Sequence, residues 1–367
     1  MNSNIADSHE NKRSDWMLYG CYGYSGELIL EEAIKKGLRP ILAGRNDKKT
    51  RQLAEKYHLP YRAFDLSCAE TIERNISDCF MVFNAAGPYS STCIPLLKAC
   101  IKQGVHNLSL AGEIPILEEL HGYDKEAQDS NIVIAVGLGF DVMPTDALAA
   151  RVIEEMPDAS HLTIGLDGPN DMSRGSMKEF FEQIGEQPFW IRSNGKLVES
   201  KPKTKQLDFG NGKKLASSIA WGDTASAYHS TGIPNIEVYS AVSYSDWLLI
   251  KSLNAFSFLF KSKGVQTLLN KCIDKLLSGP NEKEREQRIT YLCAEASNVK
   301  GDKVKINMTT PSSYKITYLG AVHAIEYMIQ KPETKGGYYT PAQLLSYQGI
   351  TKIEGVSEMT VISSKHE

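Results

Sequence analysis

The sequence predicts an α/β fold, in which a doubly wound parallel sheet is joined to a second α+β domain with a mixed or antiparallel sheet. Three observations support this prediction. Short apolar runs alternate with helix-like segments through the first half of the chain, and the first turn carries three glycines. In the second half, strand-like runs cluster without alternating helices, which is typical of antiparallel or mixed sheets.

The first strand and helix enclose the glycine-rich turn YGCYGYSG at 19–26. The apolar run WMLY at 16–19 predicts a buried strand, and the segment 25–37 has apolar residues at helical spacing. A strand that turns sharply into a helix needs residues that tolerate unusual angles and close approach. Dinucleotide-binding turns have this requirement, because the pyrophosphate rests on N–H groups at the helix N-terminus. The spacing G-x-x-G-x-x-G is not the commoner G-x-G-x-x-G, so a plain turn is the alternative.

The remaining elements of the first half follow in order. Strands are expected at 39–46, 60–66, 79–88, 105–112 and 132–137, with helices between them at 47–58, 69–76, 92–104 and 115–130. Six strands alternating with helices predict a Rossmann-type parallel sheet. Right-handed crossovers would then place ligands at the carboxyl ends of the strands, which favours the dinucleotide interpretation of the glycines.

The end of the second strand indicates which dinucleotide binds. An acidic residue there would bind the ribose 2′-hydroxyl of NAD, but the local sequence AGRN has no acid before Asp47. The guanidinium of Arg45 suits the 2′-phosphate of NADP, which it can hold with two parallel hydrogen bonds. NADP (NADPH) is therefore the expected cofactor, and a surface arginine that starts a helix is the alternative.

The residues expected to contact the cofactor lie in the glycine turn and at the ends of strands two to five. Asp65 and Leu66 could meet the adenine edge, Gly87 would permit close approach of the backbone, and Asn84 could instead cap its loop. The full set is Gly20, Tyr22, Gly23, Tyr24, Ser25, Gly26, Gly44, Arg45, Asn46, Asp65, Leu66, Ala85, Ala86, Gly87, Pro88 and Gly112.

At these residues the chain resembles the saccharopine dehydrogenase-like oxidoreductases, a family that includes trans-acting enoyl reductases. The matching stretches are YGCYGYSG, RPILAGRN, NAAGPYS, HNLSLAGE, GLGFDVMPTD and GGYYTPAQLL. The resemblance implies NADP binding, a nicotinamide near the ends of strands four to six, and a second domain of mixed sheet packed over that cleft. Members of the family reduce either an imine or a carbon–carbon double bond, and the glycine pattern is nearer the enoyl reductase type. The segment 173–185 resembles a helix of the family, although Met177 and Lys178 depart from its pattern.

The second half has clear hairpin signals. Asn194-Gly195 within 189–199 is a preferred two-residue hairpin turn, and a second hairpin is expected from 289–298 and 303–310. Further strands are expected at 161–168, 213–222 and 235–244, and helices at 245–260, 264–278 and 312–332. The resulting organisation is a flexible N-terminus at 1–15, an NADP-binding Rossmann domain at 16–156 completed by 325–350, and a substrate or dimerisation domain at 157–324.

Two residues are candidates for catalysis. Tyr89 could donate a proton or stack beside the nicotinamide, and Asp141 could bind an amine, act in catalysis or begin a helix. Glu113 is expected to cap a helix, and His106 to be a satisfied core histidine. Tyr327 and Lys331 have the Tyr-x-x-x-Lys spacing of short-chain dehydrogenases, but they lie far past the sixth strand, where the pair is a coincidence. No metal-ligand spacing stands out.

Composition limits the classes of partner. Hydrophobic and charged contents of 42% and 23% are globular values, and a formal net charge of −3 predicts no general attraction to nucleic acid or anionic membranes. Seven cysteines without a C-x-x-C pair fit a reducing cytoplasm. The apolar run 247–260 is too short to span a bilayer, so it is expected in the core, in a homodimer interface or against a membrane surface.

The substrate is expected to be neutral or apolar. Arg174 and Arg192 are the only arginines between 152 and 284, and carboxylate recognition favours arginine. The segment 220–239, rich in small and hydroxyl residues, is the expected contact region. The function that follows is reduction of a C=C, C=O or C=N bond by hydride transfer from NADPH. The alternatives are a non-catalytic NADP-binding sensor and an imine-reducing enzyme of the saccharopine dehydrogenase type.

Overall fold

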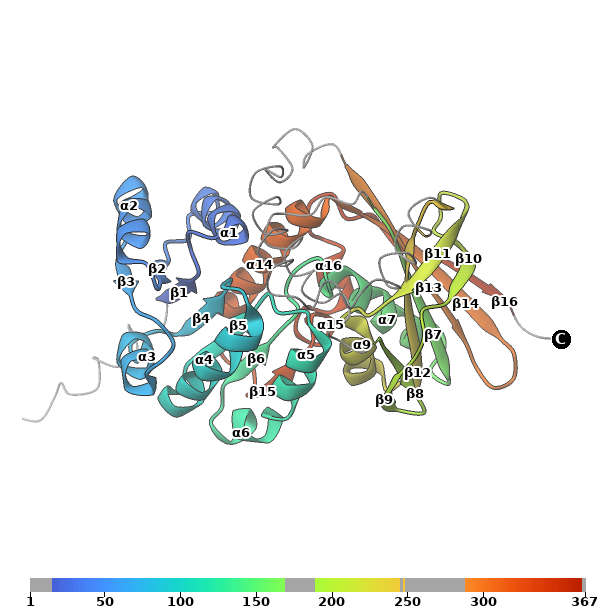
Figure 1. The fold of residues 1–367 in the computed structure, drawn as a ribbon, viewed down its shortest axis with the longest axis horizontal. Helices are drawn as coiled ribbons and strands as arrows, with labels where there is room; N and C mark the ends of the chain where they lie inside the picture. Colours follow the sequence, from blue (N-terminus) through green and yellow to red (C-terminus); the bar gives the residue numbers. More distant parts are fainter. Residues whose placement is uncertain (1–14, 169–188, 245–246, 248–287, 365–367) are drawn as a thin grey trace, which may run out of the picture. The chain divides into compact units, whose positions relative to one another are not determined.

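The computed structural model describes residues 15–168, 189–244, 247 and 288–364 (Figure 1). The chain forms two compact units, one of Met1–Met143 with Thr317–Ser346 and the other of Pro144–Ile316 with Tyr347–Glu367. The helices expected at 173–185 and 264–278, nearly all of the helix at 245–260, Arg174 and all but the last residue of the predicted flexible N-terminus lie outside the described residues.

The first unit contains a seven-stranded sheet in which every described pair is parallel. Its strand order is β15-β6-β5-β4-β1-β2-β3, the doubly wound order with one strand added from the C-terminal part of the chain. The predicted parallel sheet is confirmed. The strands are β1 (Trp16–Tyr19), β2 (Ile41–Gly44), β3 (Tyr61–Ala63), β4 (Met81–Asn84), β5 (His106–Ser109), β6 (Val133–Ala135) and β15 (Gly337–Tyr339).

Helices cover both faces of this sheet, so its central strands are buried along their whole length. Figure 1 shows α1 and α2 on one face and α3 and α4 on the other. β1, β4 and β5 are buried at every residue; β1 and β4 are mainly apolar in sequence, whereas β5 buries the polar residues His106, Asn107 and Ser109. The helices of this unit are α1 (Tyr24–Lys35), α2 (Asp47–Tyr57), α3 (Ala69–Ile76), α4 (Tyr89–Gln103), α5 (Ile114–His121), α6 (Asp124–Asp129), most of α14 (Ser313–Gln330), and α15 (Pro341–Leu345).

One helix predicted for this unit is wrong in its extent. The single helix expected at 115–130 is two helices, α5 and α6, which meet at Gly122 and Tyr123. Gly122 N donates to the carbonyls of Glu118 and Glu119 and ends α5. Glycine is a poor helix former because its backbone loses the most conformational freedom, so a break at this position has a local cause.

The second unit is built on a nine-stranded mixed sheet, as the sequence predicted. Its main order is β10-β11-β12-β7-β13-β14-β16, and the β8–β9 hairpin joins it through β12. Among the described pairs of this sheet, only β12–β7 is parallel. The strands are β7 (His161–Asp167), β8 (Trp190–Ser193), β9 (Lys196–Glu199), β10 (Thr204–Asp208), β11 (Lys213–Ile219), β12 (Asn235–Ala241), β13 (Ile289–Ser297), β14 (Lys303–Pro311) and β16 (Thr360–Ser364), with helices α7 (Met143–Glu155), α9 (Asp223–Thr231) and α16 (Tyr347–Ile350).

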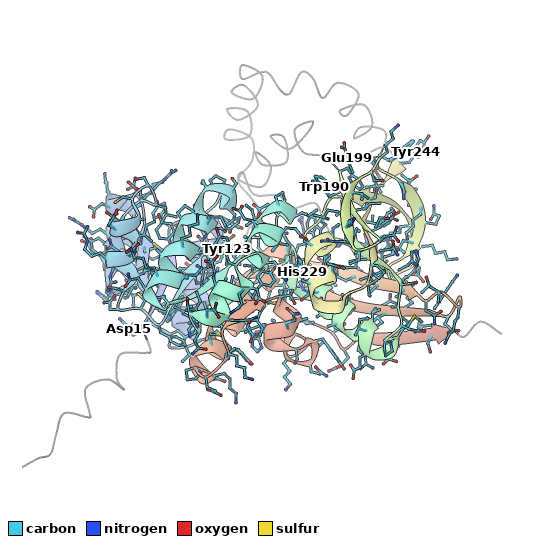
Figure 2. The ribbon with its side chains drawn as sticks, turned by 90° about the horizontal axis from the view of Figure 1, so that it is seen from below. Asp15, Tyr123, Trp190, Glu199, His229 and Tyr244 are labelled. Atoms are coloured by element: carbon cyan, nitrogen blue, oxygen red, sulfur yellow. The ribbon has the colours of Figure 1, made fainter. Side chains whose placement is uncertain are left out.

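Both predicted hairpins are present. Asn194 and Gly195 have φ values of 49° and 77°, and a two-residue turn with both φ angles positive matches the right-handed twist of its strands. Trp190 and Glu199, which pair across this hairpin, are labelled next to each other in Figure 2. The second hairpin, β13–β14, pairs from Ile289↔Pro311 to Ser297↔Lys303.

β10 was not predicted from the sequence. Thr204 and Lys205 of this strand pair with Ser217 and Ala216 of β11. The Lys205 ammonium lies 4.4 Å from the centroid of the Tyr239 ring and donates to Thr163 Oγ1 at 2.9 Å. Burial lowers the pKa of Lys205. A lysine can enter a strand when its stem packs on the sheet and its charge finds such partners.

Candidate functional site

The glycine-rich turn between β1 and α1 lies where β1, β2 and β4 end. Gly20 has a φ of 88°, in the left-handed region, and its N–H donates to Ala43 O at 2.8 Å. A Cβ atom at Gly20 would lie 2.7 Å from Ala86 N, and a Cβ atom at Gly26 would lie 2.2 Å from Gly20 O. These two glycines are required by the packing of the turn itself.

The middle glycine of the turn has no such requirement. Gly23 is the N-cap residue of α1 and has extended backbone angles, φ −76° and ψ 160°, that any residue can adopt. A Cβ atom there would meet Gly20 O at 3.2 Å, a tight contact, and Ala85 O at 4.0 Å. Its absence leaves the backbone uncovered at the start of α1, where N–H groups and the helix dipole favour an anion. Tyr24 and Ser25, also predicted to contact the cofactor, form the first residues of this helix.

The end of β2 carries the predicted 2′-phosphate residue. Arg45 is exposed, and among the residues described here no hydrogen bond or ion pair of its guanidinium is found. Asn46 caps α2, since its side chain accepts from Lys49 N at 3.0 Å. Gly44 is buried beneath the ring of Tyr22, whose hydroxyl accepts a hydrogen bond from Asn46 N at 3.2 Å. Three of the predicted residues, Tyr22, Gly44 and Asn46, therefore form one connected group.

Asp65 and Leu66 follow β3, which ends earlier than predicted, at Ala63. The Asp65 carboxylate accepts from both the backbone N–H and the hydroxyl of Ser67. These bonds lower the pKa of Asp65. The Asp65 carboxylate is exposed, and its hydrogen bonds close a local turn. Leu66, the next residue, is half-buried.

The loop after β4 is held in place by hydrogen bonds of Asn84 and Thr92. Asn84 is buried, its Oδ1 accepts from Ala86 N at 3.0 Å, and its Nδ2 donates to Thr92 Oγ1 at 3.3 Å. The Thr92 hydroxyl in turn donates to Ala86 O at 2.6 Å. Asn84 therefore has the loop-capping role that the sequence left open, and the Thr92 contact was not foreseen.

The surface of the same loop is open. Ala85 is buried and Ala86 is half-buried, whereas Gly87 and Pro88 are exposed. Tyr89, a candidate for catalysis, is half-buried and begins α4. The buried hydrogen bonds thus present Gly87 and Pro88 to solvent at the carboxyl end of a central strand.

Asp141 lies beside Gly112, at the ends of β6 and β5. A Cβ atom at Gly112 would be 2.9 Å from Asp141 Cβ and 3.6 Å from its Oδ2. The Asp141 side chain is open to water, yet the protein atoms crowded around it partly desolvate its carboxyl and raise its pKa to about 6. The fold therefore places Asp141, a predicted catalytic residue, against Gly112, a predicted cofactor-binding residue.

Two neighbouring residues have structural contacts. Glu113 occupies the N-cap position of α5, but its side chain makes no capping bond and instead accepts from Gly112 N at 3.1 Å. His106 is buried, its Nδ1 accepts from Val133 N at 2.9 Å, and its ring packs edge-on against Phe80. His106 is a satisfied core histidine, as predicted.

In the second unit, the hydroxyl-rich segment expected to contact substrate uses its side chains internally. Ser226 and Ser230 of α9 donate to the buried carboxylate of Asp146 at 3.2 and 2.7 Å. Thr145 donates to Asp223 at 2.9 Å. These bonds join α9 to α7, and no spacing in the sequence indicated the pairing.

Arg192 lies next to the Asn194-Gly195 turn, yet only 4% of the residue is exposed. Its guanidinium donates to Thr224 O and Gly195 O and lies over the Tyr228 ring. This guanidinium is thus engaged within its own unit.

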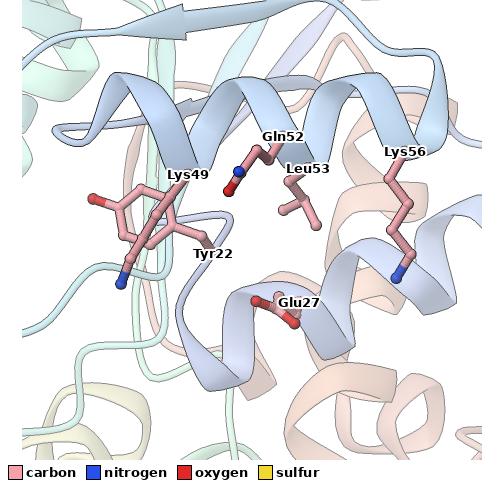
Figure 3. Close-up of a pocket in the computed structure, with 6 residues that line it drawn as sticks. All are labelled: Tyr22, Glu27, Lys49, Gln52, Leu53 and Lys56. Carbon is pink, nitrogen blue, oxygen red and sulfur yellow. The ribbon is translucent and has the colours of Figure 1, made fainter.

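A surface pocket of about 290 Å³ lies between α1 and α2 (Figure 3). Of the predicted cofactor residues, only Tyr22 lines it, together with Glu27, Lys49, Gln52, Leu53 and Lys56. Burial raises the pKa of Glu27, and the two lysines oppose that effect. The pocket thus adjoins the group formed by Tyr22, Gly44 and Asn46.

Two other kinds of site receive no support within the described residues. No group of three or more histidine, cysteine or acidic side chains there could hold a metal ion. Over the same residues, no helix combines the length and the apolar character needed to cross a membrane.

Comparison with known proteins finds relatives that are named as reductases or oxidoreductases. A trans-acting enoyl reductase of Mycobacterium tuberculosis is 31% identical over 147 residues, which cover 38% of this chain and 35% of that protein. A saccharopine dehydrogenase-like oxidoreductase of Mus musculus is 25% identical over 150 residues, 35% of each chain. The aligned part is thus about a third of the length of these relatives. No protein-family model matches the chain.

A solved structure extends the likeness in fold. The saccharopine dehydrogenase (L-Glu forming) of Saccharomyces cerevisiae aligns with 96% of this chain and 100% of its own, with a TM-score of 0.66 and 12% sequence identity. At this identity the match supports the fold alone. Together these comparisons confirm the resemblance predicted from the sequence: the chain resembles the saccharopine dehydrogenase-like oxidoreductases and the trans-acting enoyl reductases.

Proposed function

We propose that this protein is an NADP(H)-dependent oxidoreductase that reduces a neutral or apolar C=C, C=O or C=N bond. The observation that carries the proposal is Arg45. Its guanidinium is exposed, lies at the end of β2 next to the glycine turn, and makes no hydrogen bond or ion pair among the described residues. A guanidinium left available in that place suits the 2′-phosphate that distinguishes NADP from NAD.

The glycine turn fits the pyrophosphate of the same cofactor. Gly23 is the one glycine of the turn that combines ordinary backbone angles with no atom closer than 3.2 Å to its missing Cβ. A side chain there would cover the start of α1, so the bare backbone is explained by a ligand that must come close. Gly87 and Pro88 would lie along the cofactor beyond the pyrophosphate.

The chemistry divides between cofactor and protein. NADPH, when bound, supplies the hydride. Asp141, with a pKa raised to about 6, holds its proton closer to neutral pH than an ordinary aspartate and is the candidate proton donor. Tyr89 is the alternative donor, because its phenol begins α4 directly after the exposed Gly87 and Pro88.

The preference for an uncharged substrate rests on the arginines of the second unit. The guanidinium of Arg192 is buried and engaged with backbone carbonyls and an aromatic ring. It is therefore a poor candidate for binding a di-acid substrate such as an amino acid adduct. An enoyl or ketone-bearing chain fits better, and the name of the mycobacterial relatives supports the enoyl class.

NADPH consumption over a panel of enoyl thioesters, ketones and imines tests this function. We expect turnover with at least one uncharged substrate and much weaker turnover with NADH. Reductive condensation of lysine with an oxo-diacid at an ordinary enzymatic rate would show the imine-reducing alternative instead. Tight NADPH binding without turnover on any class would favour the sensor. A cytoplasmic location and a homodimer remain predictions from the sequence.

A further inference from the structure

Tyr22 covers the end of β2. Its side chain leaves the glycine turn and lies over Gly44, so closely that a Cβ atom at Gly44 would stand 2.5 Å from Tyr22 Cε1 and 3.2 Å from Cζ. The ring can occupy this place only because position 44 has no side chain. Tyr22 and Gly44 are therefore complementary in shape, although Tyr22 lies between β1 and α1 and Gly44 ends β2.

The Tyr22 hydroxyl contacts the other end of the short connection between β2 and α2. It accepts a hydrogen bond from Asn46 N at 3.2 Å, and Asn46 is the residue that caps α2. The Lys49 ammonium lies 5.7 Å from the centroid of the Tyr22 ring, and Figure 3 shows the two side chains alongside each other. Tyr22 thus contacts the end of β2 and the start of α2.

Arg45 is the residue between these two contacts. Its neighbours on both sides are held by Tyr22, while the guanidinium itself has no hydrogen bond or ion pair in the described part of the chain. The backbone at Arg45 is therefore fixed before any ligand arrives, and only the side chain remains to be ordered. Fixing the backbone in advance reduces the entropy lost on binding, which strengthens the interaction without a new contact.

We propose that Tyr22 is a positioning residue that sets the preference for NADPH over NADH by holding the backbone of Arg45. This inference rests on the proposed function, because it assigns Arg45 to the 2′-phosphate. Tyr22 acts through its ring on Gly44 and its hydroxyl on Asn46 N. Removal of either contact lowers NADPH affinity and leaves NADH affinity nearly unchanged, since NADH has no phosphate for Arg45 to bind.

The test measures dissociation constants of NADPH and NADH by fluorescence titration for the full chain and its variants. Tyr22→Phe keeps the ring and removes the hydroxyl, so it isolates the bond to Asn46 N. We expect it to weaken NADPH binding about threefold to tenfold, the scale of one hydrogen bond, and to change NADH binding less than about twofold. Tyr61→Phe is the matched control, because it removes a tyrosine hydroxyl that accepts its bond from Arg51 of α2 and not from Asn46 N.

A double-mutant cycle tests the contact with Gly44. Gly44→Ala should displace the ring and reduce the NADPH preference, whereas the same change combined with Tyr22→Ala should add little, because there is no ring left to displace. Additive losses, or equal losses for both cofactors, would overturn the inference. If Tyr22→Ala does not fold, the ratio measured for Tyr22→Phe decides the question.

The outcomes separate this inference from the proposed function. A wild-type chain that binds neither dinucleotide would overturn both. A wild-type chain that prefers NADPH, loses the preference with Arg45→Ala and keeps it with Tyr22→Phe would overturn the role of Tyr22 alone. A weaker preference in both Arg45→Ala and Tyr22→Phe, with the preference unchanged in Tyr61→Phe, would support it.

Discussion

Gly26 lies directly against the carbonyl of Gly20, so that a Cβ atom at position 26 would stand only 2.2 Å from Gly20 O. This contact closes the turn between β1 and α1, and it does not depend on a bound ligand. Gly23, in the middle of the same turn, has no comparable contact. Glycine is therefore needed in YGCYGYSG for two different reasons: Gly26 for the packing of the turn, and Gly23 for the proposed close approach of the cofactor. Substitutions can test the two reasons separately.

We predict that Gly26→Ala destabilises the fold by about 1–3 kcal/mol, because the added methyl forces the turn apart. Gly23→Val, in contrast, should leave a folded chain that no longer binds NADPH, because its side chain occupies the space expected for the pyrophosphate. Thermal unfolding and NADPH titration distinguish the two. A Gly23→Val chain that binds NADPH normally would place the cofactor elsewhere.

Arg45→Ala should weaken NADPH binding by about 1–3 kcal/mol, the scale of a charge-assisted hydrogen bond, and leave NADH binding nearly unchanged. Titration with both cofactors measures this. Arg51→Ala is the control, because it removes another exposed guanidinium from the neighbouring α2, already paired with Asp47 at 3.2 Å. Equal losses for NADPH and NADH in the Arg45 variant would contradict the assignment.

Asp141 should make stability depend on pH in a defined direction. Its folded pKa is raised to about 6 because the surrounding protein atoms partly desolvate the carboxyl, so the folded chain binds this proton more tightly than the unfolded chain does. This contribution to stability is present below about pH 4 and is lost as the pH rises towards about 6, because ionisation is disfavoured in the fold. Asp141→Asn should remove this part of the pH dependence and become relatively more stable above pH 6.

Denaturant unfolding of the wild type and Asp141→Asn between pH 4 and 7 measures the effect. The unfolding free energy of the wild type minus that of Asp141→Asn should fall as the pH rises across this window. Parallel curves would show that Asp141 titrates as an ordinary surface aspartate. Rates of NADPH oxidation that fall above pH 6 in the wild type, and not in the variant, would add evidence for a role in proton transfer.

Ser230→Ala should destabilise the chain without changing cofactor preference. It removes a 2.7 Å donor from the buried carboxylate of Asp146, which typically costs about 1–3 kcal/mol. The ratio of NADPH to NADH affinity should stay constant, since the change lies in the second unit. Ser200→Ala is the control, because that hydroxyl makes only an exposed 3.5 Å contact with Lys201 O. A wild-type melting temperature for Ser230→Ala would show that Asp146 does not depend on this bond.

The sequence alone determined the elements whose causes are local. β1 and β4 of the parallel sheet are visible as mainly apolar runs, and the Asn194-Gly195 turn is visible because few residues adopt positive φ angles readily. The position of Arg45 just after β2 follows from the same local spacing. Each of these features depends on residues within a few positions of one another.

Tertiary structure decided the features that depend on residues far apart in the chain. Lys205 enters β10 because Tyr239 and Thr163 contact its side chain, and the hydroxyls of Ser226 and Ser230 are engaged because Asp146 lies against them. The match between Tyr22 and Gly44, like the hydrogen bonds beneath Ala86, arises only when the ends of several strands converge. A residue's periodicity and propensity describe its own segment, whereas these contacts depend on the free energy of packing and hydrogen bonding between segments, which only the fold specifies.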